Sequence, residues 1–271
     1  MAAAAPRVAG RHPELSQQEL QTELLPGGVR YDVDGQIARV TLARPFKRNA
    51  QTPDMWLRLA EIGAELPADV RVVVVTGEGP SFSAGLDRSM FGTLPNQLGQ
   101  GDDAFLALIA SYQAGFTWLR NEQFVSIAAV QGHAVGAGFQ LALACDLRIV
   151  AEDAQFTMAE PALGLVPDLG GTQVLVDLVG YARALEICAT GRRVGAGEAA
   201  GIGLANLVAP ADQLAASVDD LAAAICGSPA AAVTATKALL LGARDRSYAD
   251  QLLAERTAQM ARIKALAGGQ T

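Results

Sequence analysis

Cysteine and histidine are scarce in this chain of 271 residues. The three cysteines, Cys145, Cys188 and Cys226, are widely spaced and include no CxxC pair, which favours buried, reduced thiols over a disulfide framework and points to the cytoplasm. The two histidines, His12 and His133, lie far apart in the sequence. This argues against a histidine-rich metal site and against a Ser-His-Asp triad, so we expect no bound metal.

Long apolar runs and an excess of positive charge are also absent. No apolar stretch reaches the roughly 18 residues needed to span a bilayer, and Met1–Ala5 is too short for a signal-peptide core, so we expect neither membrane anchoring nor secretion. The net charge of −7 argues against a nucleic-acid partner. The glycines between 132 and 138 do not form a dinucleotide fingerprint, so nicotinamide and flavin cofactors are not expected.

The remaining composition, with 51% hydrophobic residues, supports one substantial core. Residues 1–28 lack sustained periodicity and predict a flexible extension. Residues 29–209 alternate strand and helix patterns, which predicts a mostly parallel, layered α/β core. Residues 210–271 predict helices without intervening strands, and their apolar stripes need a covering surface, for which self-association is the preferred explanation.

Individual elements follow from local patterns. Asp34-Gly35 favours a tight turn between two strands, and Thr52-Pro53 is typical of a helix start. The predicted strands are 29–33, 36–42, 70–76, 126–130, 146–151 and 154–158. The predicted helices are 53–66, about 102–120, 170–189, 211–226, 230–242 and 248–267.

Two segments carry a pattern that indicates chemistry. Ile127–Asp146 leads from a buried strand into small residues that open a helix, and Ser81–Asp87 follows another apolar strand with a similar turn. Backbone N–H groups left unpaired at such turns can face a developing negative charge. Two of these donors together would make an oxyanion hole. Close packing of strand against helix explains either turn, taken alone, equally well.

Five ordered segments give the chain a family resemblance. They are 43–50, 82–87, 128–138, 144–146 and 164–172. Together they resemble the crotonase, or enoyl-CoA hydratase/isomerase, superfamily over roughly residues 29–265. The resemblance implies a crotonase-like spiral of ββα repeats, a helical C-terminal oligomerisation region and assembly as a homotrimer or hexamer.

The resemblance also implies a coenzyme A thioester as substrate, with CoA entering only as part of the substrate and no separate cofactor. The oxyanion hole would then be the backbone N–H groups of Leu86 and Ala137. Gly136 is small enough to let the substrate approach the main chain. Losing one oxyanion donor typically costs about 3 to 4 kcal/mol of transition-state stabilisation.

The family's hydratases use two glutamates, and this chain keeps one of them. The first position is Gln140, which can hold water or substrate but cannot accept a proton at neutral pH. The second is Glu160, the strongest catalytic candidate, although a surface carboxylate would be the ordinary explanation without the family pattern. One carboxylate suits proton transfer better than water addition.

Asp168 is a further catalytic candidate. It lies eight residues after Glu160 and resembles an aspartate of the dienoyl-CoA isomerase branch, which also carries an acid at the position of Gln140 here. Two nearby carboxylates would separate in pKa and form an acid/base pair. A turn residue or a helix N-cap is an equal alternative for Asp168.

The remaining candidates concern substrate binding. Lys47 and Arg48 lie where the family often meets the CoA phosphates and adenine, although solvated surface charge explains them equally well. Ala84 and Asp87 belong to the 82–87 motif beside the pantetheine path, and capping alone would explain Asp87. Lys237 could reach a phosphate, but a lone helix-surface lysine usually has no specific role.

The leading hypothesis is therefore a cytoplasmic enzyme that moves a double bond in an acyl-CoA, with Glu160 shuttling the proton and Gln140 orienting the acyl chain or a water. The alternatives are 2-enoyl-CoA hydration, dienoyl-CoA isomerisation by Glu160 and Asp168, and a non-catalytic acyl-CoA-binding subunit.

Overall fold

The computed structural model describes residues 25–92 and 101–269. Its first element is a 3-10 turn, Pro26–Gly28, and a Cβ at Gly27 would lie 2.7 Å from the carbonyl oxygen of Asp54. Residues 26–28, which were predicted as part of the extension, therefore belong to the folded body. The rest of the predicted N-terminal extension, residues 1–24, lies outside the described residues.

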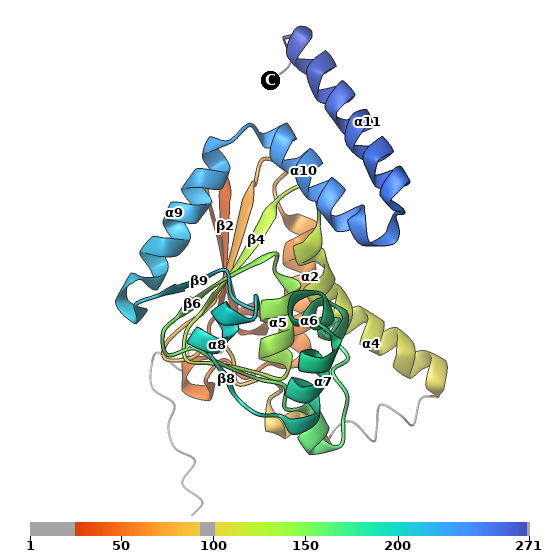
Figure 1. The fold of residues 1–271 in the computed structure, drawn as a ribbon. Coiled ribbons are helices and arrows are strands. Elements are labelled where there is room, and N and C mark those ends of the chain that lie inside the picture. The colour runs from red at the N-terminus through yellow and green to blue at the C-terminus, as the bar shows by residue number, and fades with distance from the viewer. Residues whose placement is uncertain (1–24, 93–100, 270–271) are drawn as a thin grey trace, which may run out of the picture.

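A six-stranded sheet forms the centre of the molecule (Figure 1). Its strands in spatial order are β1 (Val29–Asp34), β2 (Ile37–Leu42), β3 (Val72–Gly77), β4 (Val125–Val130), β6 (Leu147–Ala151) and β9 (Leu207–Ala209). β1 pairs antiparallel with β2, whereas every other neighbouring pair is parallel. The β-branched run in β3 is buried on both faces of the sheet, as parallel strands covered by helices require.

Helices cover both faces of this sheet. On one face, α2 (Pro53–Glu65) and α4 (Asp102–Thr117) pack on each other through Trp56, Tyr112 and Phe116. The other face packs against α9 (Leu214–Gly227), through Val72, Val74 and Ile127 of the sheet. The side chains of β3 alternate between these two clusters because successive residues of a strand point to opposite faces.

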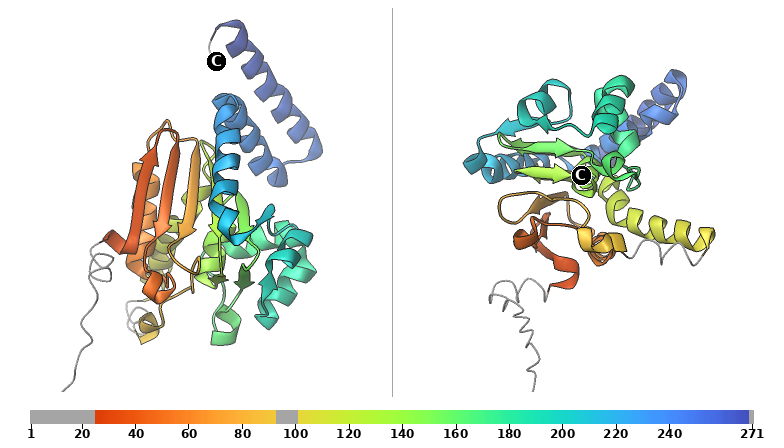
Figure 2. Two further views of the ribbon diagram at one scale, coloured as in Figure 1. Left: turned by 90° about the vertical axis from the view of Figure 1, so that its left-hand side faces the viewer. Right: turned by 90° about the horizontal axis from the view of Figure 1, so that it is seen from below.

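A second sheet contains three short strands, β5 (His133–Val135), β7 (Gln155–Thr157) and β8 (Val194–Gly195). Four helices accompany it, and Figure 2 shows this part beside the large sheet. They are α5 (Ala137–Ala144), α6 (Gly171–Val179), α7 (Tyr181–Thr190) and α8 (Ala196–Gly201). All eight residues of α5 are buried, so α5 is the internal element on which the surrounding segments converge.

The chain ends in α10 (Ala230–Gly242) and α11 (Tyr248–Ala267), and α11 extends away from the main body (Figures 1 and 2). None of the α11 side chains is buried, and Leu253, Met260 and Ile263 are more than half exposed. Within residues 25–92 and 101–269, no single helix is long and apolar enough to cross a membrane. By length and composition alone, the pair 211–227 and 230–245, bent by 105°, passes that test together.

The predicted α/β class, the opening hairpin and the three C-terminal helices are confirmed. Two predictions were incomplete. Residues 170–189 form two helices, because Gly180 adopts φ 79° and ψ 157° and interrupts them. The segment before α5 contains the additional strand β5, so β4 does not lead directly into the helix.

Candidate active site

The turn that carries Leu86 is held by backbone pairing with Gln51. The N–H of Gln51 donates to the carbonyl of Gly85 at 2.7 Å, and the N–H of Asp87 donates to the carbonyl of Gln51 at 2.8 Å. Because alternate residues of an extended segment point to opposite sides, the N–H of Leu86 faces away from Gln51. It has no acceptor among the described residues and is available to a ligand.

Buried amide side chains fix this turn further. Asn49 Nδ2 donates to the carbonyls of Ser81 and Glu78 at 2.8 and 2.9 Å. Gln51 accepts from Trp56 Nε1 at 2.7 Å and donates to Ser83 Oγ at 3.1 Å. Asn49 and Gln51 are both fully buried. The sequence analysis did not single them out, because an amide next to a motif does not reveal which distant carbonyl it binds.

The carboxylate of Asp87 forms hydrogen bonds with other residues of the protein. One oxygen accepts from Arg44 at 3.0 Å, and the other accepts from the N–H and hydroxyl of Ser89. The capping alternative for Asp87 is therefore confirmed. The hydrogen bonds to Ser89 and Arg44 outweigh partial burial and hold the pKa of Asp87 below its ordinary value.

The second turn places Ala137 at the start of α5. Gly136 adopts φ 51° and ψ −117°, a backbone conformation that side chains disfavour, and its own N–H donates to the carbonyl of Thr157 at 2.8 Å. The N–H of Ala137 follows directly and has no acceptor among the described residues. The Ala137 N–H is therefore a second free backbone donor, and it lies at the N-terminus of α5.

The two turns lie against each other. Ser83 and Ala134 form an isolated parallel bridge, with Ser83 N–H donating to His133 O at 2.8 Å. A Cβ at Gly85 would lie 2.5 Å from the carbonyl oxygen of Val135 and 3.6 Å from the Ala137 nitrogen. Since only glycine permits this approach, Gly85 brings the Leu86 turn to the start of α5, and the two free donors occupy adjoining segments.

Glu160 lies at the same place. It opens a 3-10 helix, Glu160–Leu163, that begins after β7 and the two residues Met158 and Ala159, and a Cβ at Gly136 would lie 3.2 Å from Glu160 Oε1. Oε1 accepts from Gln140 Nε2 at 2.7 Å, whereas Oε2 is buried and has no hydrogen-bond partner among the residues that the structure describes. Burial raises the pKa of Glu160, and the nearby charge of Asp168 adds to the increase.

Gln140 forms hydrogen bonds within the protein, and its expected role in orienting the acyl chain or a water stays a prediction. Its side chain is buried, its Nε2 binds Glu160, and its Oε1 accepts from the N–H of Leu169 at 2.9 Å and of Gly171 at 3.4 Å. These contacts are with the protein, so the amide links the carboxylate to the 168–171 turn.

Asp168 belongs to that turn. Its carbonyl accepts from Gln113 Nε2 of α4 at 2.7 Å, and partial desolvation raises the pKa of its carboxyl group. The helix N-cap alternative is wrong, because Gly170 occupies that position of α6. The charge of Asp168 contributes to the raised pKa of Glu160, which indicates that the two candidate carboxylates lie near each other.

The candidate CoA contacts lie beside the Leu86 turn. Lys47 and Arg48 are exposed, and neither forms an ion pair within the described part of the chain. The carbonyl of Arg48 accepts from the N–H of Ala84 at 2.8 Å. This hydrogen bond places Arg48, and with it the neighbouring Lys47, beside the segment that contains Leu86.

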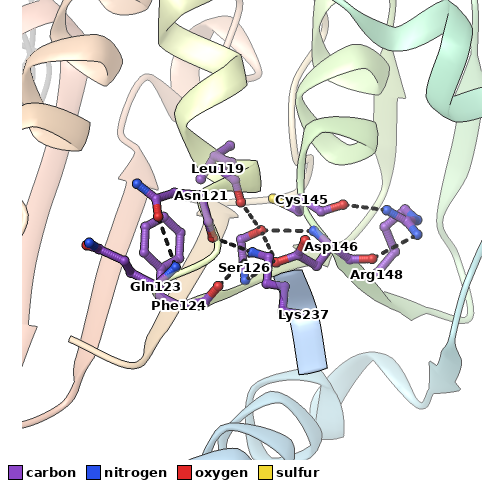
Figure 3. A network of polar contacts seen from close by, with 9 residues as sticks. All are labelled: Leu119, Asn121, Gln123, Phe124, Ser126, Cys145, Asp146, Arg148 and Lys237. Atoms are coloured by element: carbon purple, nitrogen blue, oxygen red, sulfur yellow. Dashed lines mark hydrogen bonds and ion pairs between the residues drawn. The ribbon is translucent and has the colours of Figure 1, made fainter. Parts of the chain in front are cut away.

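Lys237 is not the surface lysine that the sequence suggested. Its ammonium group donates to Asp146 Oδ2 and to the carbonyls of Asn121 and Phe124, each at 2.6 Å (Figure 3). Ser126 completes the network, donating to Asp146 Oδ2 through its N–H at 2.8 Å. Lys237 therefore anchors α10 to the start of β4, and its charge is neutralised inside the protein.

A cavity of about 740 Å³ lies beside this network, between α10 and the core, and includes Arg120, Gln173 and Thr236 in its lining. None of the residues of the candidate active site lines it. Within the described residues, no group of three or more His, Cys, Asp or Glu side chains is arranged to hold a metal ion.

Two adjoining backbone donors beside a partly buried carboxylate form a site that can stabilise an enolate. A family model for enoyl-CoA hydratase/isomerase matches residues 32–266, and the chain belongs to this family. The peroxisomal Delta(3,5)-Delta(2,4)-dienoyl-CoA isomerase of Arabidopsis thaliana is 33% identical over 228 residues, covering 81% of this chain and 82% of its own. "Probable enoyl-CoA hydratase echA8" of Mycobacterium tuberculosis (strain CDC 1551 / Oshkosh) is 33% identical over 225 residues, covering 82% and 84%.

Among solved structures, "a putative enoyl-CoA hydratase" of Thermobifida fusca YX in complex with CoA is 50% identical. The match has a TM-score of 0.85 and covers 94% of this chain and 98% of the other. The crotonase fold expected from the sequence motifs is confirmed by this similarity.

Proposed function

We propose that the protein is an acyl-CoA double-bond isomerase in which Glu160 transfers the proton and the N–H groups of Leu86 and Ala137 stabilise the enolate. The observation that carries the proposal is the environment of Glu160. It is the carboxylate that lies against Gly136, and an amide rather than a second carboxylate contacts it. One base beside two backbone donors meets the needs of a proton shift.

The reaction begins with a 3-enoyl thioester whose carbonyl oxygen accepts from both backbone N–H groups. Ionised Glu160 removes a proton from C2, and the electron pair of that C–H bond moves through C1 onto the carbonyl oxygen. The resulting dienolate is stabilised by the two donors. Protonated Glu160 then returns the proton to C4, the double bond reforms between C2 and C3, and the glutamate is ionised again.

The substrate proposal rests on the family and on charge. The related Thermobifida fusca protein contains CoA, and the exposed Lys47 and Arg48 suit a nucleotide polyanion. No further cofactor or metal is needed for the proton shift. The exposed apolar side chains of α11 support assembly as a homotrimer or hexamer, and the three unpaired cysteines support a cytoplasmic location.

A second candidate is dienoyl-CoA isomerisation with Asp168 as partner of Glu160. The supporting observation is the electrostatic interaction between the two carboxylates, together with the similarity to the Arabidopsis thaliana dienoyl-CoA isomerase. Two acids separated in pKa would allow one to remove a proton and the other to deliver one over a longer conjugated system.

The test compares 3-enoyl, 3,5-dienoyl and 2-enoyl thioesters on the wild type, Glu160→Gln and Asp168→Asn. Simple isomerisation predicts turnover of the 3-enoyl substrate that collapses in Glu160→Gln and persists in Asp168→Asn. Loss in both variants with the dienoyl substrate would support the second candidate. Efficient hydration of the 2-enoyl substrate without isomerisation would refute both, and thioester binding without any turnover would indicate a binding subunit.

A further inference from the structure

We infer that Gln140 is a positioning residue: its amide holds Glu160 Oε1 in place and leaves Oε2 as the oxygen that exchanges the proton with the substrate. The inference rests on the proposed function, in which Glu160 is the base. It assigns different roles to the two oxygens of one carboxylate. The basis is that Oε1 has a partner at 2.7 Å, while Oε2 is buried and has none within the described part of the chain.

The orientation of the Gln140 amide follows from its other contacts. Its Oε1 accepts from the N–H of Leu169 at 2.9 Å and from the N–H of Gly171 at the longer distance of 3.4 Å. A flipped amide would point its NH₂ group at these donors and leave them unsatisfied. The NH₂ group must therefore face Glu160, as a permanent donor to Oε1.

Packing leaves the amide little freedom to move. Gln140 is only 1% exposed and extends from α5, which is wholly buried. On its other side, a Cβ at Gly171 would lie 2.9 Å from Gln140 Cγ. Gly171, the first residue of α6, has no side chain and so leaves room for Gln140, and the two residues pack closely against each other.

The groups that act on Glu160 make this donor important. Asp168 approaches from the turn and Cys188 from α7, and both interact electrostatically with Glu160. Neither is a cation. The hydrogen bond from the Gln140 amide favours the ionised form. Gln140 therefore supports the base form without contributing a charge.

The experiment measures the ionisation of Glu160 directly, without substrate. Glutamate carrying ¹³C at the carboxyl carbon is incorporated, and the Glu160 resonance is identified by its absence in Glu160→Gln. In Gln140→Met, which removes the donor at similar volume, the titration of Glu160 should move upward by about one pH unit, equivalent to a tenfold change in its protonation equilibrium. The acid limb of kcat should move by the same amount, with little change in KM.

Gln113→Met is the matched control. It removes a glutamine bond to the same turn, at the Asp168 carbonyl, without touching Glu160, and should leave the Glu160 titration in place. An unchanged Glu160 titration in Gln140→Met would overturn the inference, as would an equal shift in the control.

If Gln140→Met does not fold, Gln140→Glu provides the test, because it retains an acceptor for the N–H of Leu169. The two carboxylates should then share one proton and titrate in two steps, the upper one above the wild-type Glu160 pKa. A Glu160 titration identical to the wild type would overturn the inference. Because the titration of Glu160 is measured without turnover, it tests the role of Gln140 separately from the isomerase assay, even if that assay detects no activity.

Discussion

Replacement of Gly136 by alanine tests whether the backbone at this residue sets the geometry of both the base and the oxyanion donor. Gly136 has φ 51° and ψ −117°, and the added Cβ would meet Glu160 Oε1, Cδ and Oε2 at 3.2, 3.4 and 3.5 Å. Such a backbone conformation costs a non-glycine residue on the order of 1–3 kcal/mol. The strain can be relieved only by rotating the peptide that carries the Ala137 N–H or by displacing Glu160.

The expected effect on activity follows from the oxyanion donor. Loss of one such donor typically lowers kcat by about 10² to 10³, or roughly 3–4 kcal/mol. We therefore expect kcat on the preferred thioester to fall by about that factor, with a smaller change in KM because the proposed CoA contacts at Lys47 and Arg48 lie elsewhere. Steady-state kinetics and urea unfolding would be measured on the same preparation.

Gly180→Ala is the matched control. Gly180 also has a positive φ, 79° with ψ 157°, but its Cβ would meet nothing within 4 Å. Both variants should lose stability, and only Gly136→Ala should lose activity per folded molecule. Normal kcat in Gly136→Ala, or an equal loss of kcat in Gly180→Ala, would refute the reasoning.

Three further predictions concern the surrounding network. Lys237→Met should lower the free energy of unfolding by about 3–5 kcal/mol, because it leaves the largely buried carboxylate of Asp146, whose side chain is 16% exposed, without its cation. Urea titration would check this, and an effect below 1 kcal/mol would mean that the pair is unimportant. The acid limb of kcat/KM should lie above pH 4.5, the ordinary value for glutamate, because burial and Asp168 raise the pKa of Glu160 and the base must be ionised. Asp168→Asn should move that limb to lower pH, and a pH profile that moves upward would contradict the assignment. Asp87→Asn should weaken the ion pair with Arg44 beside the Leu86 turn, lower the free energy of unfolding by about 1.5–3 kcal/mol and lower kcat/KM with it. Urea unfolding and steady-state kinetics would check this, and a loss of stability with unchanged kcat/KM would show that the turn keeps its position without this ion pair.

Local patterns in the sequence were sufficient for most elements. The Asp34-Gly35 turn, the Thr52 cap whose hydroxyl accepts from Met55 N–H, and the β-branched run of β3 each depend on neighbours in the chain. Short strands were missed because they contain too few residues to show a period. β5 and β8, with three and two residues, exist through pairing with β7 rather than through their own propensity.

The motifs also identified the candidate site, because a glycine-rich turn followed by a helix has a chemical consequence that can be read from the residue types. Their roles remain predictions until they are tested by substitution. The sequence did not reveal the supporting contacts that the Asn49 and Gln51 side chains make with Glu78, Ser81 and Ser83, which lie 29 to 32 residues away in the chain. Which carbonyl a buried amide binds depends on how the loops fold together.

Gln140 and Lys237 also show which properties follow from residue type and which depend on tertiary contacts. The sequence by itself determined the fold class, the family motifs and the replacement of a carboxylate by an amide at residue 140, since these depend on residue type and order. Only the tertiary structure decided that this amide binds Glu160 and the Leu169 N–H, and that Lys237 lies buried against Asp146 rather than in solvent. The physical reason is that burial and hydrogen-bond partners arise between segments distant in sequence, and their packing sets the charge and direction of each polar group.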